Sequence, residues 1–150
     1  MTKVMFVCLG NICRSPMAEF VLKDLVRRRN LENEFYIKSS ATSTEEIGNG
    51  VHYGTVNKLN SVGIPVEYRE AVQLKKSDYE KYDYIIGMEE RNVANIFRIV
   101  GQDNENKVNR LLDFSNNPRD IADPWYTGNF DKTYNDILEG CEAFLKSLNY

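Results

Sequence analysis

The amino-acid sequence predicts an α/β fold: one parallel β-sheet, covered by helices on both faces, in a single three-layer domain. Short apolar runs of strand length alternate with longer segments whose apolar residues recur every three or four positions, which is the spacing of an amphipathic helix. Such alternation is typical of parallel sheets that are buried on both faces. No linker, internal repeat or low-complexity tract divides the 150 residues, so we expect one domain that spans residues 1–150.

Composition and charge limit the classes of function. Apolar residues make up 42% of the chain and charged residues 27%, with a formal net charge of −3. The sequence therefore lacks both the basicity of a nucleic-acid-binding protein and the roughly 18-residue apolar run of a membrane span. The N-terminus leads directly into a strand-length apolar run instead of a signal peptide, and three cysteines do not form a secreted disulfide framework. We expect a cytoplasmic protein that binds neither nucleic acid nor membrane, and we expect a monomer.

The first strand and the first helix enclose the most informative stretch of the chain. The strand is the apolar run Val4–Val7, and the periodicity of apolar residues predicts the helix from Pro16 to about Asn30. Ser15 is placed to cap this helix, with Pro16 at its first position. A loop that leads into a helix N-terminus directs backbone N–H groups and the positive end of the helix dipole into one small space, which predicts an anion-binding site.

The later elements follow from the same periodicity and from residues that begin or end helices. Gly63 and Pro65 end one expected helix, and Ser77 and Glu80 form the pattern of a capping box. Cys141 lies on an apolar helical stripe, so we expect it in the core. In chain order we expect a strand at 35–39, a polar loop at 39–54, a helix at 51–62, a short helix from 77, a strand at 82–88, a helix at 89–100, a strand at 108–112, a loop at 113–130 and a final helix along 134–148.

The loop after the first strand is Cys8-Leu9-Gly10-Asn11-Ile12-Cys13-Arg14-Ser15. A Cys8 thiolate at the mouth of the anion site is stabilised by the same N–H groups that would hold a phosphate, and the guanidinium of Arg14 can bind two phosphate oxygens at once. Gly10 and Asn11 tolerate tight or left-handed backbone, and Ser15 can donate a hydrogen bond to the Cys8 sulfur. These residues indicate in-line attack by Cys8 on phosphorus, which gives a phosphocysteine. The alternative is an ordinary turn with two buried cysteines.

A second candidate site lies in the long loop before the last helix, in Asp123-Pro124-Trp125-Tyr126. Two large aromatic side chains in a loop suit a slot for a flat ring. A carboxylic acid beside such a slot can protonate a leaving oxygen, and as a carboxylate it can then activate water. From the residues alone, a turn formed by Asp123 and Pro124 remains the alternative.

The cysteine-containing loop resembles the signature loop of the low-molecular-weight protein tyrosine phosphatase family. The resemblance continues through Ser39-Ser40-Ala41-Thr42 and Asp83-Tyr84-Ile85-Ile86-Gly87-Met88 to Asp123-Pro124-Trp125-Tyr126, and so covers nearly the whole chain. It implies the phosphotyrosine protein phosphatase I-like fold, a four-stranded parallel sheet with helices on both sides. It also implies hydrolysis of phosphotyrosine on proteins, with neither a metal ion nor a cofactor.

The resemblance also implies a role for each matching residue. Cys8 is the nucleophile, and Asp123 is the general acid and then the general base. Cys13 is a redox partner that forms a disulfide with Cys8 under oxidation; the alternative is a small packing residue. Ser15 stabilises the thiolate, and Asn11 holds the shape of the loop. Phosphate or another oxyanion is held by Arg14 and the backbone N–H groups of Leu9, Gly10, Asn11, Ile12, Cys13 and Arg14, and the substrate slot is lined by Ile12, Trp125 and Tyr126.

One segment departs from the pattern of the family. Where the family often has G-x-P-x-D-x-R, this chain has Gly48-Asn49-Gly50-Val51-His52-Tyr53-Gly54, so His52 and Gly54 stand at the acidic and basic positions. His52 is the only histidine of the chain and lacks the spacing of a metal ligand. We expect it to make a structural hydrogen bond.

Four alternative functions use similar parts. Related arsenate reductases share the loop but need a further redox cysteine pair, whereas only Cys141 follows here. Related arginine phosphatases place threonine where Ile12 stands, and Ile12 would pack on a phenyl ring but leave the N–H groups of a guanidinium unmatched. A phosphocarrier domain uses a phosphocysteine after its first strand but lacks the pairing of Arg14 with Asp123. A non-catalytic phosphopeptide binder would not turn over para-nitrophenyl phosphate.

Overall fold

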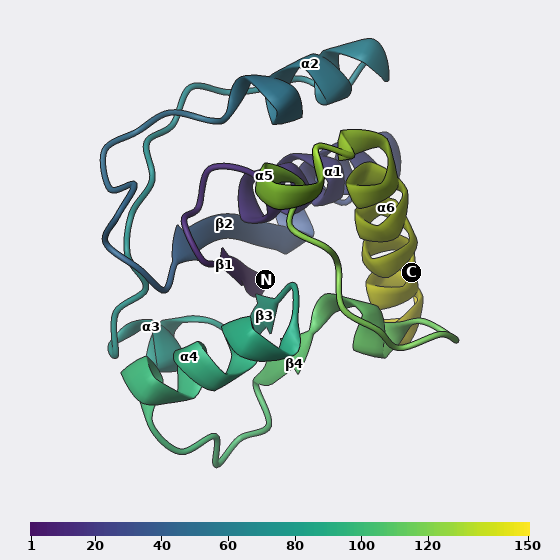
Figure 1. Ribbon diagram of the computed structural model, residues 1–150. Coiled ribbons are helices and arrows are strands. Elements are labelled where there is room, and N and C mark those ends of the chain that lie inside the picture. Colours follow the sequence, from purple (N-terminus) through teal and green to yellow (C-terminus); the bar gives the residue numbers. More distant parts are fainter.

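A parallel sheet forms the centre of the molecule. The computed structural model describes all residues, 1–150, and contains a four-stranded, all-parallel sheet in the order β2-β1-β3-β4 (Figure 1). The strands are β1 (Thr2–Cys8), β2 (Phe35–Ala41), β3 (Tyr84–Gly87) and β4 (Val108–Arg110). The predicted parallel sheet is confirmed.

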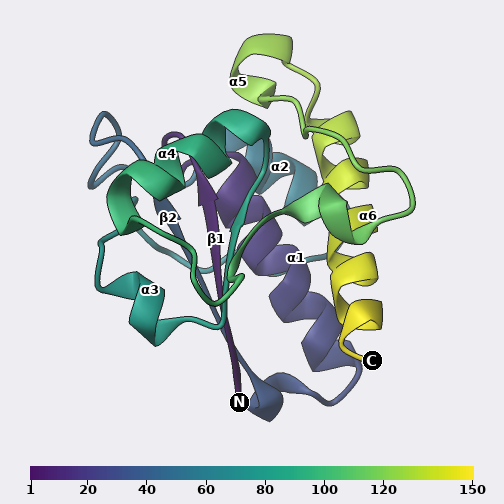
Figure 2. The same cartoon turned by 90° about the horizontal axis from the view of Figure 1, so that it is seen from below.

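Helices cover both faces of this sheet. Figure 2 shows α1 (Arg14–Arg28) and α6 (Phe130–Ser147) packed side by side on one face, with α3 (Asp78–Lys81) and α4 (Glu90–Val100) on the other. The remaining elements are α2 (Tyr53–Ser61), α5 (Pro124–Thr127) and the 3₁₀ turns η1 (Glu32–Glu34) and η2 (Leu111–Phe114). The predicted layering of helix, sheet and helix is therefore also confirmed.

β1 shows why the sheet lies between two cores. Its side chains alternate between the faces: Val4, Phe6 and Cys8 join the core under α1 and α6, whereas Met5 and Val7 join the core under α3 and α4. In the parallel register, Cys8 pairs with Ala41 of β2. Because parallel strands end at the same edge of the sheet, the loops that follow β1 and β2 meet beside Cys8.

The predicted cap of the first helix is wrong. α1 begins at Arg14, one residue before Ser15, and its N-cap residue, Cys13, makes no side-chain capping bond. The Ser15 hydroxyl instead lies 3.0 Å from the Cys8 sulfur and accepts a hydrogen bond from the Asn11 side chain. Pro16 is accommodated because the first-turn N–H groups of a helix have no intrahelical acceptor.

The predicted capping box at Ser77 is also wrong. Ser77 makes no capping bond and has helical backbone angles, whereas an N-cap residue takes extended ones. The Asp78 carboxylate accepts from the Lys75 N–H at 2.8 Å. A capping box does form at the start of α4, where the side chains of Glu89 and Asn92 bond each other's backbone N–H groups.

Several element boundaries differ from the prediction. β2 continues to Ala41, two residues beyond the expected end, and β4 ends at Arg110, where η2 takes over. The segment expected as a loop before the last helix contains α5, which the Asp123 side chain caps by accepting from the Trp125 N–H. α6 then begins at Phe130 because the Asn129 side chain caps it by accepting from Lys132.

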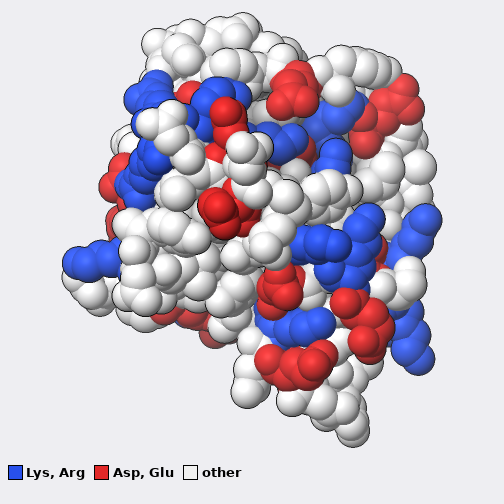
Figure 3. All heavy atoms as spheres, turned by 180° about the vertical axis from the view of Figure 1, so that it is seen from behind, with Lys and Arg blue, Asp and Glu red and all other residues white.

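The surface carries charges of both signs. Figure 3 shows acidic and basic side chains interspersed on the face opposite to the view of Figure 1. On α1, the Asp24 carboxylate pairs with Arg27 at 3.2 Å and with Arg28 at 2.9 Å. No helix combines the length and the apolar character that crossing a membrane requires.

Candidate active site

The loop from Cys8 to Arg14, called here the cysteine loop, curls at the C-terminal end of β1. Asn11 takes left-handed backbone with φ 60°, which asparagine tolerates better than most residues. Gly10 has no positive φ. A Cβ at Gly10 would lie 3.3 Å from the side chain of Glu46, so glycine lets that side chain approach the backbone of the loop. The two residues expected to permit a tight loop therefore do so for different reasons.

Two polar groups, the Asn11 N–H and the Ser15 hydroxyl, contact the Cys8 sulfur. Cys8 is buried, with 3% of its surface exposed. The Asn11 backbone N–H donates to the sulfur at 3.3 Å, and the Ser15 hydroxyl lies 3.0 Å from it. The arrangement thus provides a nucleophile at the floor of the loop.

The Asn11 side chain uses both ends of its amide to hold the loop. Its nitrogen donates to the hydroxyls of Ser15 at 2.8 Å and Ser39 at 3.0 Å. Its oxygen accepts from the Val72 N–H at 3.2 Å and from the Arg69 guanidinium at 2.5 Å. The cysteine loop is thereby tied to β2 and to the segment that follows α2.

Arg69 and Glu19 belong to this network, although no motif or spacing in the sequence pointed to them. Glu19 is only 3% exposed; its carboxylate accepts from Ser39 at 2.6 Å and pairs with Lys23 at 2.6 Å and Arg69 at 3.4 Å. Burial lowers the pKa of the Arg69 guanidinium, and the Glu19 charge opposes that shift. The only signal for Glu19 is a carboxylate within an apolar helix face, and Arg69 lies in a segment without periodicity.

Arg14 is held from three sides. Its side chain is 1% exposed, and Nη1 donates to the Ile121 carbonyl at 2.9 Å. The guanidinium also pairs with Glu89 at 3.2 Å and with Asp123 at 3.4 Å. The remaining donor, Nε, is buried without a protein acceptor. Neither Glu89 nor the Ile121 carbonyl was a candidate from the sequence.

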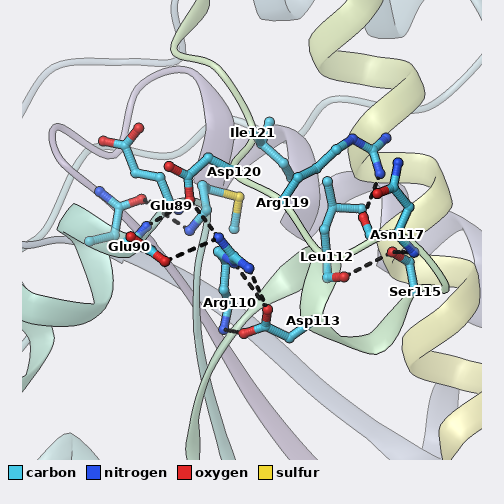
Figure 4. Close-up of polar contacts among 12 residues, drawn as sticks. Glu89, Glu90, Arg110, Leu112, Asp113, Ser115, Asn117, Arg119, Asp120 and Ile121 are labelled. Atoms are coloured by element: carbon cyan, nitrogen blue, oxygen red, sulfur yellow. Dashed lines mark hydrogen bonds and ion pairs between the residues drawn. The ribbon is translucent and has the colours of Figure 1, made fainter.

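A cluster of ion pairs fixes the segment that carries Ile121 and Asp123. The Arg110 guanidinium pairs with Asp120 at 3.0 Å and Asp113 at 2.9 Å, and Asp120 also accepts from the Glu90 N–H at 2.9 Å (Figure 4). We call Arg110 with these two aspartates the Arg110 clamp. The clamp connects β4 with the start of α4 and with the segment that leads to the candidate acid.

Asp123 combines both interpretations that the sequence left open. Its Oδ1 accepts from the Trp125 N–H at 3.0 Å and so caps α5, with Pro124 as the first residue of that helix. Its Oδ2 lies 3.4 Å from the Arg14 guanidinium. The same carboxylate therefore forms the turn and faces the cysteine loop.

One pocket of about 120 Å³ collects the candidate residues. Trp125 and Tyr126 stand at its mouth with 57% and 78% of their surfaces exposed. Two acidic residues of the loop after β2, Glu45 and Glu46, also line it and were not foreseen. The lining consists of Cys8, Leu9, Gly10, Ile12, Cys13, Arg14, Glu45, Glu46, Asp123, Trp125 and Tyr126.

The remaining cysteines and His52 lie as follows. Cys13 is a free, buried thiol that lines the same pocket as Cys8; burial, together with the neighbouring Cys8, raises the pKa of the Cys13 thiol to about 12. Cys141 is fully buried in the core, as predicted.

His52 makes the predicted structural hydrogen bond, since its Nδ1 accepts from the Gly54 N–H at 3.0 Å. No group of His, Cys, Asp and Glu side chains is arranged to hold a metal ion.

Comparison with known sequences adds a family. A family described as "Low molecular weight phosphotyrosine protein phosphatase" matches residues 3–150. The low molecular weight protein-tyrosine-phosphatase YfkJ of Bacillus subtilis is 39% identical over 150 residues, which cover 99% of this chain and 96% of the relative. The PtpA protein-tyrosine-phosphatase of Staphylococcus aureus is 36% identical, covering 97% and 92%.

Solved structures agree with the sequence comparison. The crystal structure of YfkJ from Bacillus subtilis superposes with a TM-score of 0.95 and covers 99% of this chain and 95% of that one, at 39% identity. An arginine phosphatase from Drosophila superposes with a TM-score of 0.90 at 29% identity, covering 99% of each chain.

Proposed function

The chain belongs to the low molecular weight phosphotyrosine protein phosphatase family, and from this premise we propose that it hydrolyses phosphotyrosine on proteins through a phosphocysteine formed on Cys8, without a metal ion. One observation carries the proposal. A buried cysteine sulfur, an arginine with an unpartnered donor and a carboxylate line the same pocket. We further propose that the protein acts as a cytoplasmic monomer.

A phosphoryl group fits the donors of this pocket. The Arg14 Nε–H is buried without a protein acceptor, and a buried unsatisfied donor is costly. The backbone N–H groups of Leu9, Gly10, Ile12 and Cys13 also have no acceptor within the protein. Donors without an acceptor, in a loop that lines the pocket, are available to the equatorial oxygens of a phosphoryl group in transfer.

The side chains support a two-step reaction. In the first step the Cys8 thiolate attacks phosphorus, the bond from phosphorus to the tyrosine oxygen breaks, and the leaving oxygen takes a proton from Asp123. In the second step the Asp123 carboxylate accepts a proton from water as that water attacks phosphorus. The phosphorus–sulfur bond breaks, which releases inorganic phosphate and restores the thiolate. Arg14 pairs with the phosphoryl oxygens in both steps.

Apolar and aromatic lining supports phosphotyrosine as the substrate. Ile12, Trp125 and Tyr126 present apolar surface to the pocket, which suits the two faces of a phenyl ring. A phosphoserine arm is too short to bring its phosphorus to a sulfur at the bottom of such a slot.

A second candidate function is hydrolysis of phosphoarginine. It is favoured by the acidic residues Glu45 and Glu46 in the pocket lining, which would attract a guanidinium, and by the likeness to an arginine phosphatase. Ile12 argues against it, because an isoleucine offers no acceptor to guanidinium N–H groups.

The two candidates are separated by one experiment. Purified protein is assayed on peptides of the same sequence that carry phosphotyrosine, phosphoarginine or phosphoserine, with para-nitrophenyl phosphate as a general substrate. We expect a strong preference for phosphotyrosine, and we expect Ile12→Thr to shift the preference toward phosphoarginine. A wild-type preference for phosphoarginine would replace the first candidate with the second, and no turnover on any substrate would indicate a binding protein.

A further inference from the structure

His52 connects α2 to the cysteine loop. Its backbone N–H donates to the Ile12 carbonyl at 2.8 Å, and its Nδ1 accepts from the Gly54 N–H, which caps α2. In the first turn of α2, the Thr55 hydroxyl donates to the Cys13 carbonyl at 3.1 Å. The start of α2 therefore holds two consecutive carbonyl groups of the cysteine loop.

The His52 ring also contacts the segment that carries the candidate acid. It stacks on Tyr53, with ring centroids 4.4 Å apart, and on Phe130, the first residue of α6, at 5.4 Å. The His52 and Trp125 rings make a T-shaped contact, with ring centroids 5.5 Å apart and ring planes inclined at 74°. His52 is the one aromatic side chain that Trp125 contacts. The imidazole thus lies between Phe130, at the N-terminus of α6, and Trp125, which lines the substrate slot.

Gly54 makes room for this arrangement. A Cβ at Gly54 would lie 2.3 Å from the Phe130 ring, which is far inside contact distance. Gly54 has no positive φ, so space and not backbone strain requires glycine here. His52 and Gly54, which stand where the family pattern has an acidic and a basic residue, therefore pack together with Phe130.

Trp125 needs such a support because the core does not hold it. More than half of its surface, 57%, is exposed. An exposed aromatic side chain that must be ordered by substrate weakens binding, whereas one that is held in place beforehand does not. The Trp125 N–H also donates to Asp123 Oδ1, so the placement of Trp125 and the orientation of the carboxylate are linked.

We propose that His52 is a positioning residue for the Trp125–Asp123 segment, which it holds against the cysteine loop through its ring contact with Trp125. His52 does not line the pocket, so the role is one of placement and not of catalysis. The proposal rests on the proposed function for its kinetic consequence, whereas the contact itself can be tested without any activity.

Two substitutions separate the ring from the cap. His52→Asn keeps a side-chain acceptor for the N-cap and removes the ring, whereas His52→Phe keeps a ring and removes the acceptor. His52→Ser is a second variant that caps without a ring, in case His52→Asn folds poorly. Ser61→Ala is the matched control, because Ser61 bonds Lys58 at the far end of the same helix.

Trp125 is the only tryptophan of the chain, so intrinsic fluorescence reports this contact directly, and Trp125→Phe gives the background. In His52→Asn we expect the emission to move toward that of a solvent-exposed indole. We expect KM for a phosphotyrosine peptide to rise about 2- to 12-fold, the fold-change that corresponds to the loss of one aromatic pair. On an activated aryl phosphate whose leaving group needs no proton, kcat should stay near the wild-type value.

In His52→Phe we expect the wild-type emission and KM, with a thermal midpoint lower by about 2–4 °C from the lost cap. Wild-type emission and KM in both His52→Asn and His52→Ser would overturn the proposal, as would an equal change in Ser61→Ala. If the wild-type protein turned over no phosphotyrosine, the proposed function would fail, but the emission of the variants would still decide whether His52 places Trp125.

Discussion

Asp123 shows at the scale of one residue how a single carboxylate serves structure and chemistry. One oxygen caps α5 and the other faces the Arg14 guanidinium at 3.4 Å. The cap keeps the side chain in one rotamer, and the rotamer places it in the pocket. A group that is held in this way loses little entropy when the reaction begins.

Asp123→Ala tests the acid role. We expect a loss in kcat of roughly 10²–10⁴-fold on a substrate with a poor leaving group, the usual scale of general acid–base catalysis. The loss should be much smaller on an activated aryl ester, because its leaving group departs without a proton. Asp123→Asn is the matched control, since it keeps a cap but cannot donate the same proton. Equal losses on both substrates would show that Asp123 only positions the loop.

Cys13 differs from Cys8 in chemistry although both line the pocket. Burial raises the pKa of Cys13 to about 12, so at neutral pH it remains a thiol. Peroxide reacts with thiolates, and Cys8 is the cysteine that the proposed mechanism uses as a thiolate. We therefore expect Cys8 to be oxidised first, to a sulfenic acid. Attack by the Cys13 sulfur then forms a disulfide and releases water.

The redox prediction is tested by treatment with peroxide followed by thiol. Wild-type protein should lose activity and regain it with thiol, whereas Cys13→Ser should be active before treatment and irreversibly inactive after it. Cys141→Ser is the control, because Cys141 is buried in the core away from the pocket. Peptide mapping that finds sulfinic or sulfonic Cys8 beside a free Cys13 thiol in the wild type would exclude the protective role.

At the scale of elements, the Arg110 clamp helps to place the segment that carries Ile121 and Asp123. It joins the end of β4 to Asp120, one residue before the carbonyl that holds Arg14. The other side of the same connection is fixed to α6, because Arg119 pairs with Asp136 at 2.8 Å and Glu139 at 3.0 Å. The connection is thus held by ion pairs together with Ile121, which is fully buried in the core.

Arg110→Gln should loosen this connection. We expect a free energy of unfolding lower by about 1 kcal/mol, the upper end of the range for partly exposed ion pairs. We also expect a lower kcat with KM less affected, because Arg14 and Asp123 lose their common support. Glu90→Gln is the matched control, since Glu90 is 83% exposed and 3.7 Å from Arg110. Urea unfolding and steady-state kinetics of both variants check the prediction, which fails if Arg110→Gln equals Glu90→Gln.

The elements also show where sequence reasoning succeeds. The strands and long helices were predictable because each carries a periodic apolar pattern, and the cysteine loop was predictable because its residues have few structural uses in that combination. The caps at Ser15 and Ser77 were not, because a serine hydroxyl takes whichever partner the fold offers. Arg69 was not, because its partner Asn11 lies 58 residues away.

At the scale of the whole molecule, buried thiols and phenols make the free energy of unfolding fall as pH rises in the alkaline range. Burial raises the pKa of Cys13 to about 12, and it raises the pKa of Cys141 and of Tyr82 in the same direction. Above the ordinary pKa of each group, about 8.5 for a thiol and about 10 for a phenol, the unfolded chain releases the proton and the folded chain keeps it. The unfolded state then binds fewer protons, so stability falls as pH rises.

We expect the free energy of unfolding to decrease from about pH 9 upward, with a slope of up to about 1.4 kcal/mol per pH unit for each such group. Urea unfolding between pH 7 and pH 11 measures this slope. Cys141→Ala removes one of the groups and should give a shallower slope, even though the cavity lowers stability at every pH. A slope that Cys141→Ala leaves unchanged would contradict the assignment.

The proposed mechanism depends on one atom, the Cys8 sulfur, and its most direct test is to detect a phosphoryl group on that sulfur. Protein mixed with a phosphotyrosine peptide labelled on phosphorus is quenched with acid within the first turnovers, digested and mapped. We expect sulfur-linked phosphate on the fragment that contains Cys8, and none in Cys8→Ser, which should fold, bind phosphate and show essentially no turnover. Turnover by Cys8→Ser at a rate near that of the wild type, without labelled phosphocysteine in the wild type, would contradict the mechanism.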